Sequence, residues 1–151
     1  MKALLKENKL YRPQAHPTDD PKKVIIIEDS VASILPVNMI LNSIHCTTFN
    51  CFSADEAAEI IKNNKIDLVI LDWYLFEENG IDTLSRLNGL FGQIEVKQRF
   101  QRKIPYVTYT GLSRKFLEIP QDQYFYFIQH LQKPMPLPEL TKRLLRILNQ
   151  K

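Results

Sequence analysis

The chain has 151 residues, of which 44% are hydrophobic, and its 20 basic and 17 acidic side chains leave a formal charge of +3. A chain of this size can bury one ordinary hydrophobic core and is short for two domains. The small charge excess gives no evidence for nucleic-acid binding. We recognise no signal peptide and no run of roughly 20 apolar residues that would span a membrane, so we expect a cytoplasmic protein.

The cysteines and histidines lack the spacing of a disulfide or a metal site. Cys46 and Cys51 are five residues apart on one predicted strand, so their side chains would point to opposite faces. The three histidines, His16, His45 and His130, are scattered along the chain. We therefore expect two reduced thiols and no histidine-based metal site.

The first part of the chain consists of a polar leader followed by strand and helix patterns. Residues 1–21 contain three prolines and precede a single predicted domain at residues 22–151. Within this leader, residues 3–11 either form a short amphipathic helix or belong to a disordered tail. Residues 24–27 are all β-branched, which is typical of a strand buried on both faces of a parallel sheet. A helical pattern follows, in which Pro36 is tolerated because it falls near the helix start.

The middle of the chain repeats this alternation. Residues 47–52 predict a second strand, and Ser53 with Glu56 forms a capping box that opens a helix at residues 54–63. Residues 68–71 are a third apolar run. After Gly80 a helical pattern resumes.

The last third is harder to interpret. A polar, basic stretch at residues 97–103 precedes a predicted strand at 106–109. Between residues 113 and 129, Pro120 limits any helix, and the aromatic run at 124–127 favours a strand. The final helix has one apolar stripe and a proline in its first turn. The whole order predicts an α/β fold with a doubly wound five-stranded parallel sheet and helices on both faces.

Polar side chains follow four of these strands. Glu28 and Asp29 follow the first, Asp72 the third, Thr110 the fourth and Lys133 the fifth. The carboxyl ends of parallel strands share one edge of the sheet, where such folds bind ligands. Three carboxylates there need a cation, and Mg²⁺ is the natural occupant. Asp72 can then act as a nucleophile towards phosphorus, assisted by the lysine and the threonine.

Four segments together resemble the response-regulator receiver domain of two-component signalling: KKVIIIEDS, DLVILDWYLFEENGIDTL, IPYVTYTG and QKPMPLPEL. The resemblance covers about residues 22–150 and implies a flavodoxin-like strand order, 2-1-3-4-5.

Several site roles are implied by the resemblance. The pair Glu28 and Asp29 would hold Mg²⁺, and Asp72 would be the phosphoacceptor. Tyr74 would give a main-chain carbonyl to the metal. Thr110 would be the switch hydroxyl, and Lys133, before a cis proline, the phosphate-binding lysine.

Three positions differ from the usual pattern of the family. Phe76 replaces a frequent proline, and the bulky Tyr74 implies slow loss of the phosphoryl group. His130 stands where an aromatic residue usually turns inward with the threonine, which would make switching sensitive to pH. The segment before His130 lacks the usual short turn, so we expect a short or irregular fourth helix.

The resemblance implies a phosphorylation-dependent switch, not an enzyme acting on an external substrate. A sensor histidine kinase would be the phosphodonor, and a protein contact the output, because only three residues follow the last predicted helix and leave no room for a DNA-binding domain. A phosphorelay shuttle to a histidine phosphotransfer protein and a phosphorylation-independent interaction module remain alternatives. Whether the chain forms a homodimer is left open. Phosphatases with an aspartyl-phosphate intermediate often carry a second Asp where this chain has Tyr74.

Overall fold

The structure is a computed structural model, and it describes residues 20–75, 78–92 and 102–150. The predicted leader helix at residues 3–11, Phe76 and most of the basic stretch at 97–103 lie outside the described residues.

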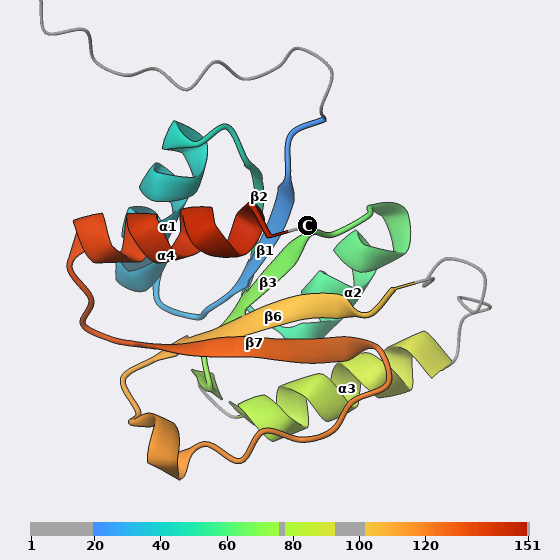
Figure 1. Cartoon of the computed structure of the whole chain (residues 1–151). Coiled ribbons are helices and arrows are strands. Elements are labelled where there is room, and N and C mark those ends of the chain that lie inside the picture. The colour runs from blue at the N-terminus through green and yellow to red at the C-terminus, as the bar shows by residue number, and fades with distance from the viewer. Residues whose placement is uncertain (1–19, 76–77, 93–101, 151) are drawn as a thin grey trace, which may run out of the picture.

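Strands and helices alternate along the chain (Figure 1). Their bounds are β1 Lys23–Ile27, α1 Val31–Ser43, β2 Thr47–Cys51, α2 Ala54–Asn63, β3 Leu68–Leu71, β4 Tyr74–Leu75, β5 Glu78–Asn79, α3 Gly80–Gly92, β6 Ile104–Thr110, β7 Phe125–Gln132 and α4 Leu137–Leu148. The predicted strands are all present. The short antiparallel pair β4 and β5, which follows the end of β3, was not predicted.

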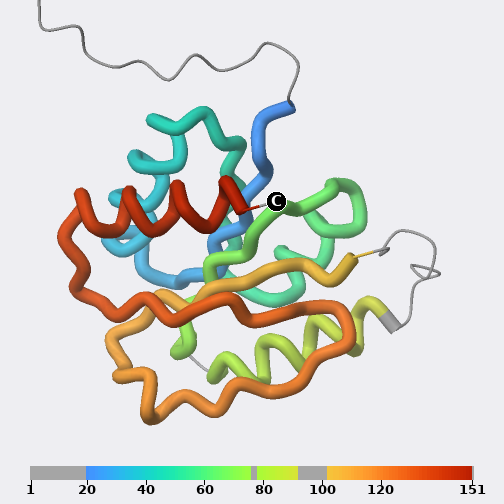
Figure 2. Tube along the Cα trace, in the orientation of Figure 1, coloured from blue at the N-terminus to red at the C-terminus, as the bar shows by residue number. Residues whose placement is uncertain are grey.

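Five strands form one parallel sheet in the order β2-β1-β3-β6-β7. Helices α1 and α4 cover one face and α2 and α3 the other, as the ribbon and the trace show (Figures 1 and 2). The predicted fold class and strand order are therefore confirmed.

The core consists of two apolar layers, one on each face of the sheet. In β1, Ile25 and Ile27 belong to the layer under α2 and α3, whereas Val24 and Ile26 belong to the layer under α1 and α4. None of these four side chains is more than 1% exposed. This double burial explains why the strand sequence shows no alternation of apolar and polar residues.

Local signals at two helices act nearly as expected. The Ser53 hydroxyl accepts a hydrogen bond from the Glu56 N–H at 3.3 Å, and the Glu56 carboxylate accepts one from the Phe52 N–H at 2.8 Å. The capping box at α2 is thus present, although the glutamate reaches the residue before the cap. Pro36 is the sixth residue of α1, further from the start than the sequence suggested, and it removes one helical N–H donor.

The link between β6 and β7 has no α-helix. It contains only a 3₁₀ turn at Arg114–Phe116, and the side chains of Leu112, Leu117 and Ile119 cover the sheet instead. We expected a short or irregular fourth helix, and this short 3₁₀ turn is what the structure has at that place.

Strand β7 contains a β-bulge. Tyr106 pairs with Phe127 and Thr108 with His130, so two residues of β7 lie opposite Val107. The extra residue reverses the alternation of side chains. Phe127 and His130 consequently face the same side of the sheet, the side covered by α2 and α3.

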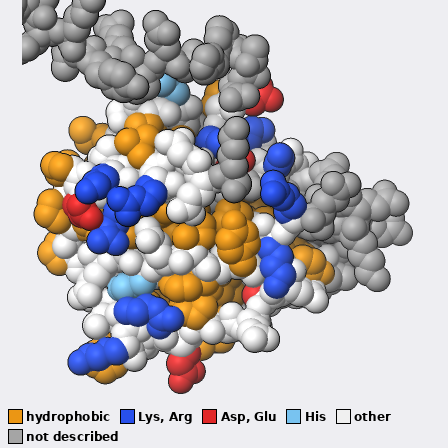
Figure 3. All heavy atoms as spheres, viewed as in Figure 1, with side chains coloured by type: hydrophobic (Ala, Val, Ile, Leu, Met, Phe, Trp, Pro, Cys, Tyr) orange, Lys and Arg blue, Asp and Glu red, His pale blue; other side chains and the backbone are white. Residues whose placement is uncertain are grey.

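Exposed basic side chains lie on α4. Figure 3 shows basic side chains gathered where α4 lies in Figure 1; on this helix Lys142 and Arg146 are exposed, and Arg143 forms an ion pair with Glu139 at 2.8 Å.

Cys51 is buried in one core layer while Cys46 packs against the other, and both are free thiols. In the part of the chain that the structure describes, every helix is too short or too polar to span a bilayer.

Candidate phosphorylation site

The ends of β1 and β3 lie side by side and bring the predicted carboxylates together. The Asp72 N–H donates to the Ile27 carbonyl at 3.0 Å, and the Glu28 N–H donates to the Cys51 carbonyl at 3.0 Å. These bonds continue the sheet one residue past its strands and fix where each acidic side chain begins. Carboxylate oxygens of Glu28, Asp29 and Asp72 then lie within 4.8 Å of one another.

The three carboxylates differ in exposure. Glu28 is 4% exposed, Asp72 is half-buried, and Asp29 is exposed. A cluster of oxygen ligands that is open on one side suits a hard divalent cation that keeps some of its water. The structure brings together the three carboxylates that the sequence indicated, and their role as metal ligands stays a prediction.

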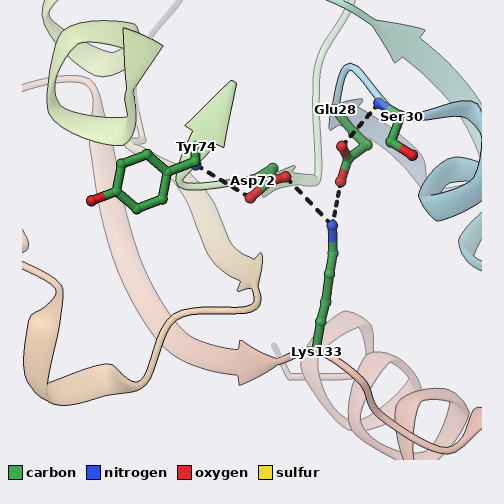
Figure 4. A network of polar contacts seen from close by, with 5 residues as sticks. All are labelled: Glu28, Ser30, Asp72, Tyr74 and Lys133. Carbon is green, nitrogen blue, oxygen red and sulfur yellow. Dashed lines mark hydrogen bonds and ion pairs between the residues drawn. The ribbon is translucent and has the colours of Figure 1, made fainter. Parts of the chain in front are cut away.

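Lys133 reaches this cluster from the end of β7 (Figure 4). Its Nζ lies 2.5 Å from Glu28 Oε2 and 3.4 Å from Asp72 Oδ2. The Lys133 N–H donates to the Thr110 carbonyl at 2.8 Å, and the bond to Pro134 is cis, as expected. One ammonium group thus neutralises part of the charge of two carboxylates.

Burial raises the pKa of Glu28, and the charge of Asp72 raises it further. The hydrogen bonds from Lys133 and from the Ser30 N–H, at 3.0 Å, oppose this shift. Burial and the neighbouring Asp72 carboxylate therefore disfavour the charged form of Glu28. A cation bound next to Glu28 would stabilise the charged form of this carboxylate.

Tyr74 contacts the site through its main chain. Its N–H donates to Asp72 Oδ1 at 3.3 Å, while the residue is 57% exposed and its ring points away from the Asp72 carboxylate (Figure 4). In this arrangement the ring does not stand over the carboxylate, so the structure gives no support for the expected obstruction of water. The predicted role of the Tyr74 carbonyl as a metal ligand stays a prediction.

The roles of Thr110 and His130 as switch residues stay predictions, and the structure shows where each side chain lies. Thr110 is 3% exposed at the end of β6. The Nδ1 atom of His130 lies 2.8 Å from the hydroxyl of Thr108, two residues earlier on the same strand. The β-bulge explains this partner, because it places His130 directly opposite Thr108.

The environment of His130 disfavours its charged form. Burial lowers the pKa of His130, the positive charge of Arg114 lowers it further, and a contact with the main chain of Leu112 offsets part of the shift. A neutral imidazole is therefore the form that this site stabilises.

Three contacts of the site were not found from sequence. Ser30 donates its N–H to Glu28, Thr108 binds His130, and the ring of Tyr109 lies under the Lys133 ammonium, with Nζ 5.1 Å from the ring centroid. A serine after an acidic pair and a threonine or tyrosine inside a strand are common, so no sequence signal marks them.

Comparison with known proteins agrees with this geometry. The family model of the response regulator receiver domain matches residues 24–145. No curated protein matches the chain.

The fold is similar to several solved receiver structures. A receiver domain from Methylobacillus flagellatus is 19% identical with a TM-score of 0.62, and the match covers 85% of this chain and 99% of that one. A response regulator from Thermotoga maritima is 18% identical with a TM-score of 0.62, covering 86% and 99%. The N-terminal domain of a response regulator/sensory box/GGDEF protein from Carboxydothermus hydrogenoformans is 19% identical with a TM-score of 0.64, covering 84% and 94%. The strand order, the acidic cluster and the family match together show that this chain belongs to the receiver domain family of two-component response regulators.

Proposed function

We propose that this receiver domain is a phosphorylation-dependent signalling switch that accepts a phosphoryl group on Asp72 from a sensor histidine kinase. The observation that carries the proposal is the surroundings of the Asp72 carboxylate: it lies within 4.8 Å of carboxylate oxygens of Glu28 and Asp29, and its Oδ2 is 3.4 Å from Lys133 Nζ. A structural role alone would not require three acidic side chains to share one sheet edge.

The residues around Asp72 prepare its carboxylate for attack on phosphorus. One oxygen accepts the Tyr74 N–H and the other faces Lys133, so the carboxylate is held in one orientation. In the reaction an Asp72 oxygen bonds to phosphorus, the phosphorus–nitrogen bond of the donor histidine breaks, and the imidazole keeps the electron pair and takes up a proton. The Lys133 ammonium can follow the transferred oxygens on its flexible stem.

Glu28, Asp29 and Asp72 would hold Mg²⁺, together with the main-chain carbonyl of Tyr74. When bound, the ion would neutralise charge on the phosphoryl oxygens. The raised pKa of Glu28 and the open side of the cluster are what support this assignment.

A protein donor is supported by the surface next to the site. Val31, Leu35 and Met39 are 59%, 56% and 67% exposed, and their spacing of four residues places them along one side of α1. Helix α1 carries no charged residue and begins two residues after Asp29. An uncharged helix surface with exposed apolar side chains suits contact with another protein.

The proposed output is a change in protein contacts. A phosphoryl group adds a charge of about −1.5 to −2 at neutral pH, which can attract the Thr110 hydroxyl and alter the surface formed by the β6–β7 link and α4. Residues 1–21 would form a separate leader before the receiver domain at 22–151.

Incubation with Mg²⁺ and acetyl phosphate tests the proposal. We expect a phosphate adduct by intact mass and a change in the fluorescence of Trp73, which is buried directly after Asp72. Asp72→Asn should abolish the adduct. Asp67→Asn is a matched control, because Asp67 bonds to the Lys23 N–H at the opposite end of β1. An adduct that survives in Asp72→Asn, or none in the wild type with an intact fold, would refute the proposal.

A further inference from the structure

Lys133 has a third neighbour besides the two carboxylates. Its Nζ lies 5.1 Å from the centroid of the Tyr109 ring. This distance is within the range of about 6 Å over which an aromatic face attracts a cation. The Lys133 side chain is only 20% exposed, so water screens the contact less than it would at the surface.

The fold fixes the position of the Tyr109 ring. Tyr109 is the last but one residue of β6, pairs with the fully buried Leu131 of β7, and packs against the core layer under α1 and α4. Thr108 and Thr110, its neighbours on the strand, point to the other face, where α2 and α3 lie. The ring is therefore supported from the core side and presents its face to the ammonium.

The three neighbours of Nζ have different roles. Glu28 and Asp72 attract the ammonium towards themselves, and Glu28 holds it closer, at 2.5 Å against 3.4 Å. A phosphoryl group on Asp72 would require the ammonium to move towards its oxygens. The uncharged ring attracts the cation without competing for its hydrogen-bonding protons in the way a third carboxylate would.

We propose that Tyr109 is a positioning residue for the phosphoryl-binding lysine, acting through the face of its ring. This inference rests on the proposed function of Asp72. Because the ring face and not the hydroxyl makes the contact, phenylalanine should replace tyrosine, whereas leucine should fill the space without holding the cation.

Titration with beryllofluoride in the presence of Mg²⁺ tests this role, with Trp73 fluorescence as the signal. We expect Tyr109→Leu to raise the half-saturating concentration about two- to thirty-fold, and Tyr109→Phe to stay close to the wild type. In a Lys133→Ala background, Tyr109→Leu should have no further effect, because the lysine that the ring holds is absent.

A nuclear magnetic resonance measurement tests the contact itself. A ring face over Nζ should shift the ε-methylene protons of Lys133 upfield in the wild type and in Tyr109→Phe, and the shift should disappear in Tyr109→Leu. An unshifted signal in the wild type would overturn the inference.

The outcomes separate the two proposals. If the folded wild type does not respond to beryllofluoride, both the proposed function and the role of Tyr109 are contradicted. If the wild type responds and Tyr109→Leu binds beryllofluoride equally well, only the inference about Tyr109 is contradicted. An equal loss with and without Lys133 would show a merely structural effect and would also overturn it.

Discussion

The two halves of the sheet differ in regularity. Strands β2, β1 and β3 keep one uninterrupted register, and each connection between them contains an α-helix. Strands β6 and β7 have a bulge between them, and their connection contains only a 3₁₀ turn. The regular half supplies Glu28, Asp29 and Asp72, whereas the irregular half supplies Thr110, His130 and Lys133.

The two halves therefore supply different kinds of residue to the site. Carboxylates that share one cation need fixed backbone positions, and continuous strand pairing gives them that. The groups that would respond to a phosphoryl group lie on the half whose ladder is interrupted by the bulge, which leaves an extra residue of β7 outside the regular pairing.

The largest effect should come from breaking the charge contact between the halves. Lys133→Met leaves the buried Glu28 carboxylate without its ammonium, and we expect the free energy of unfolding to fall by roughly 3 kcal/mol in Mg²⁺-free buffer. Urea denaturation measures this.

The control removes both charges together. Glu28→Gln combined with Lys133→Met should regain part of the lost stability, because the more deeply buried of the two carboxylates no longer carries a charge, whereas Asp72 keeps its own. A Lys133→Met variant as stable as the wild type would show that the ion pair between Lys133 and Glu28 contributes little to the free energy of unfolding.

The next effect concerns packing in the regular half. A Cβ at Gly80 would lie 2.2 Å from an atom of the Trp73 ring, so Gly80→Ala must displace the residue next to Asp72. We expect a loss of about 1–3 kcal/mol in the free energy of unfolding. Gly89→Ala on the same helix meets no atom within 4 Å and should stabilise by about 0.5–1 kcal/mol. Equal effects of the two changes would contradict this prediction.

A smaller effect is expected in the irregular half. Thr108→Val keeps the shape of a fully buried side chain but removes the hydroxyl that bonds to His130 Nδ1. The free energy of unfolding should fall by about 1 kcal/mol. In a His130→Phe background the same change should cost less, since no hydrogen bond remains to be lost. Thermal unfolding of the four proteins gives the coupling between the two residues, and a coupling of zero would rule out the contact.

The pH dependence of stability should show the smallest effect. The pKa of His130 is lowered in the folded state from its ordinary value of 6.5, so the unfolded state binds more protons. Stability contributed by the neutral imidazole is present above pH 6.5 and is lost as the pH falls through 6.5 towards the folded-state pKa. His130→Phe should remove this part of the slope. Unfolding curves between pH 5 and 8 measure it, and an unchanged slope would be evidence against a half-buried neutral imidazole.

The sequence by itself determined the strands of both halves and the residues at their ends. Runs such as residues 24–27 favour burial on both faces, and a parallel sheet between two helix layers provides that. The rule that parallel strands bind ligands at their carboxyl ends then placed Glu28, Asp29, Asp72 and Lys133 together, and their positions in the structure agree.

Only the tertiary structure decided the partners within the site. Lys133 lies closer to Glu28 than to Asp72, Tyr109 lies under its ammonium, and His130 contacts the hydroxyl of Thr108. The last of these follows from the bulge in β7, which accompanies the packing of Phe125 and Phe127 against the ring of Tyr106. Burial leaves a periodic signal in a single segment, whereas the register between two strands depends on side chains about twenty residues apart that meet only after folding.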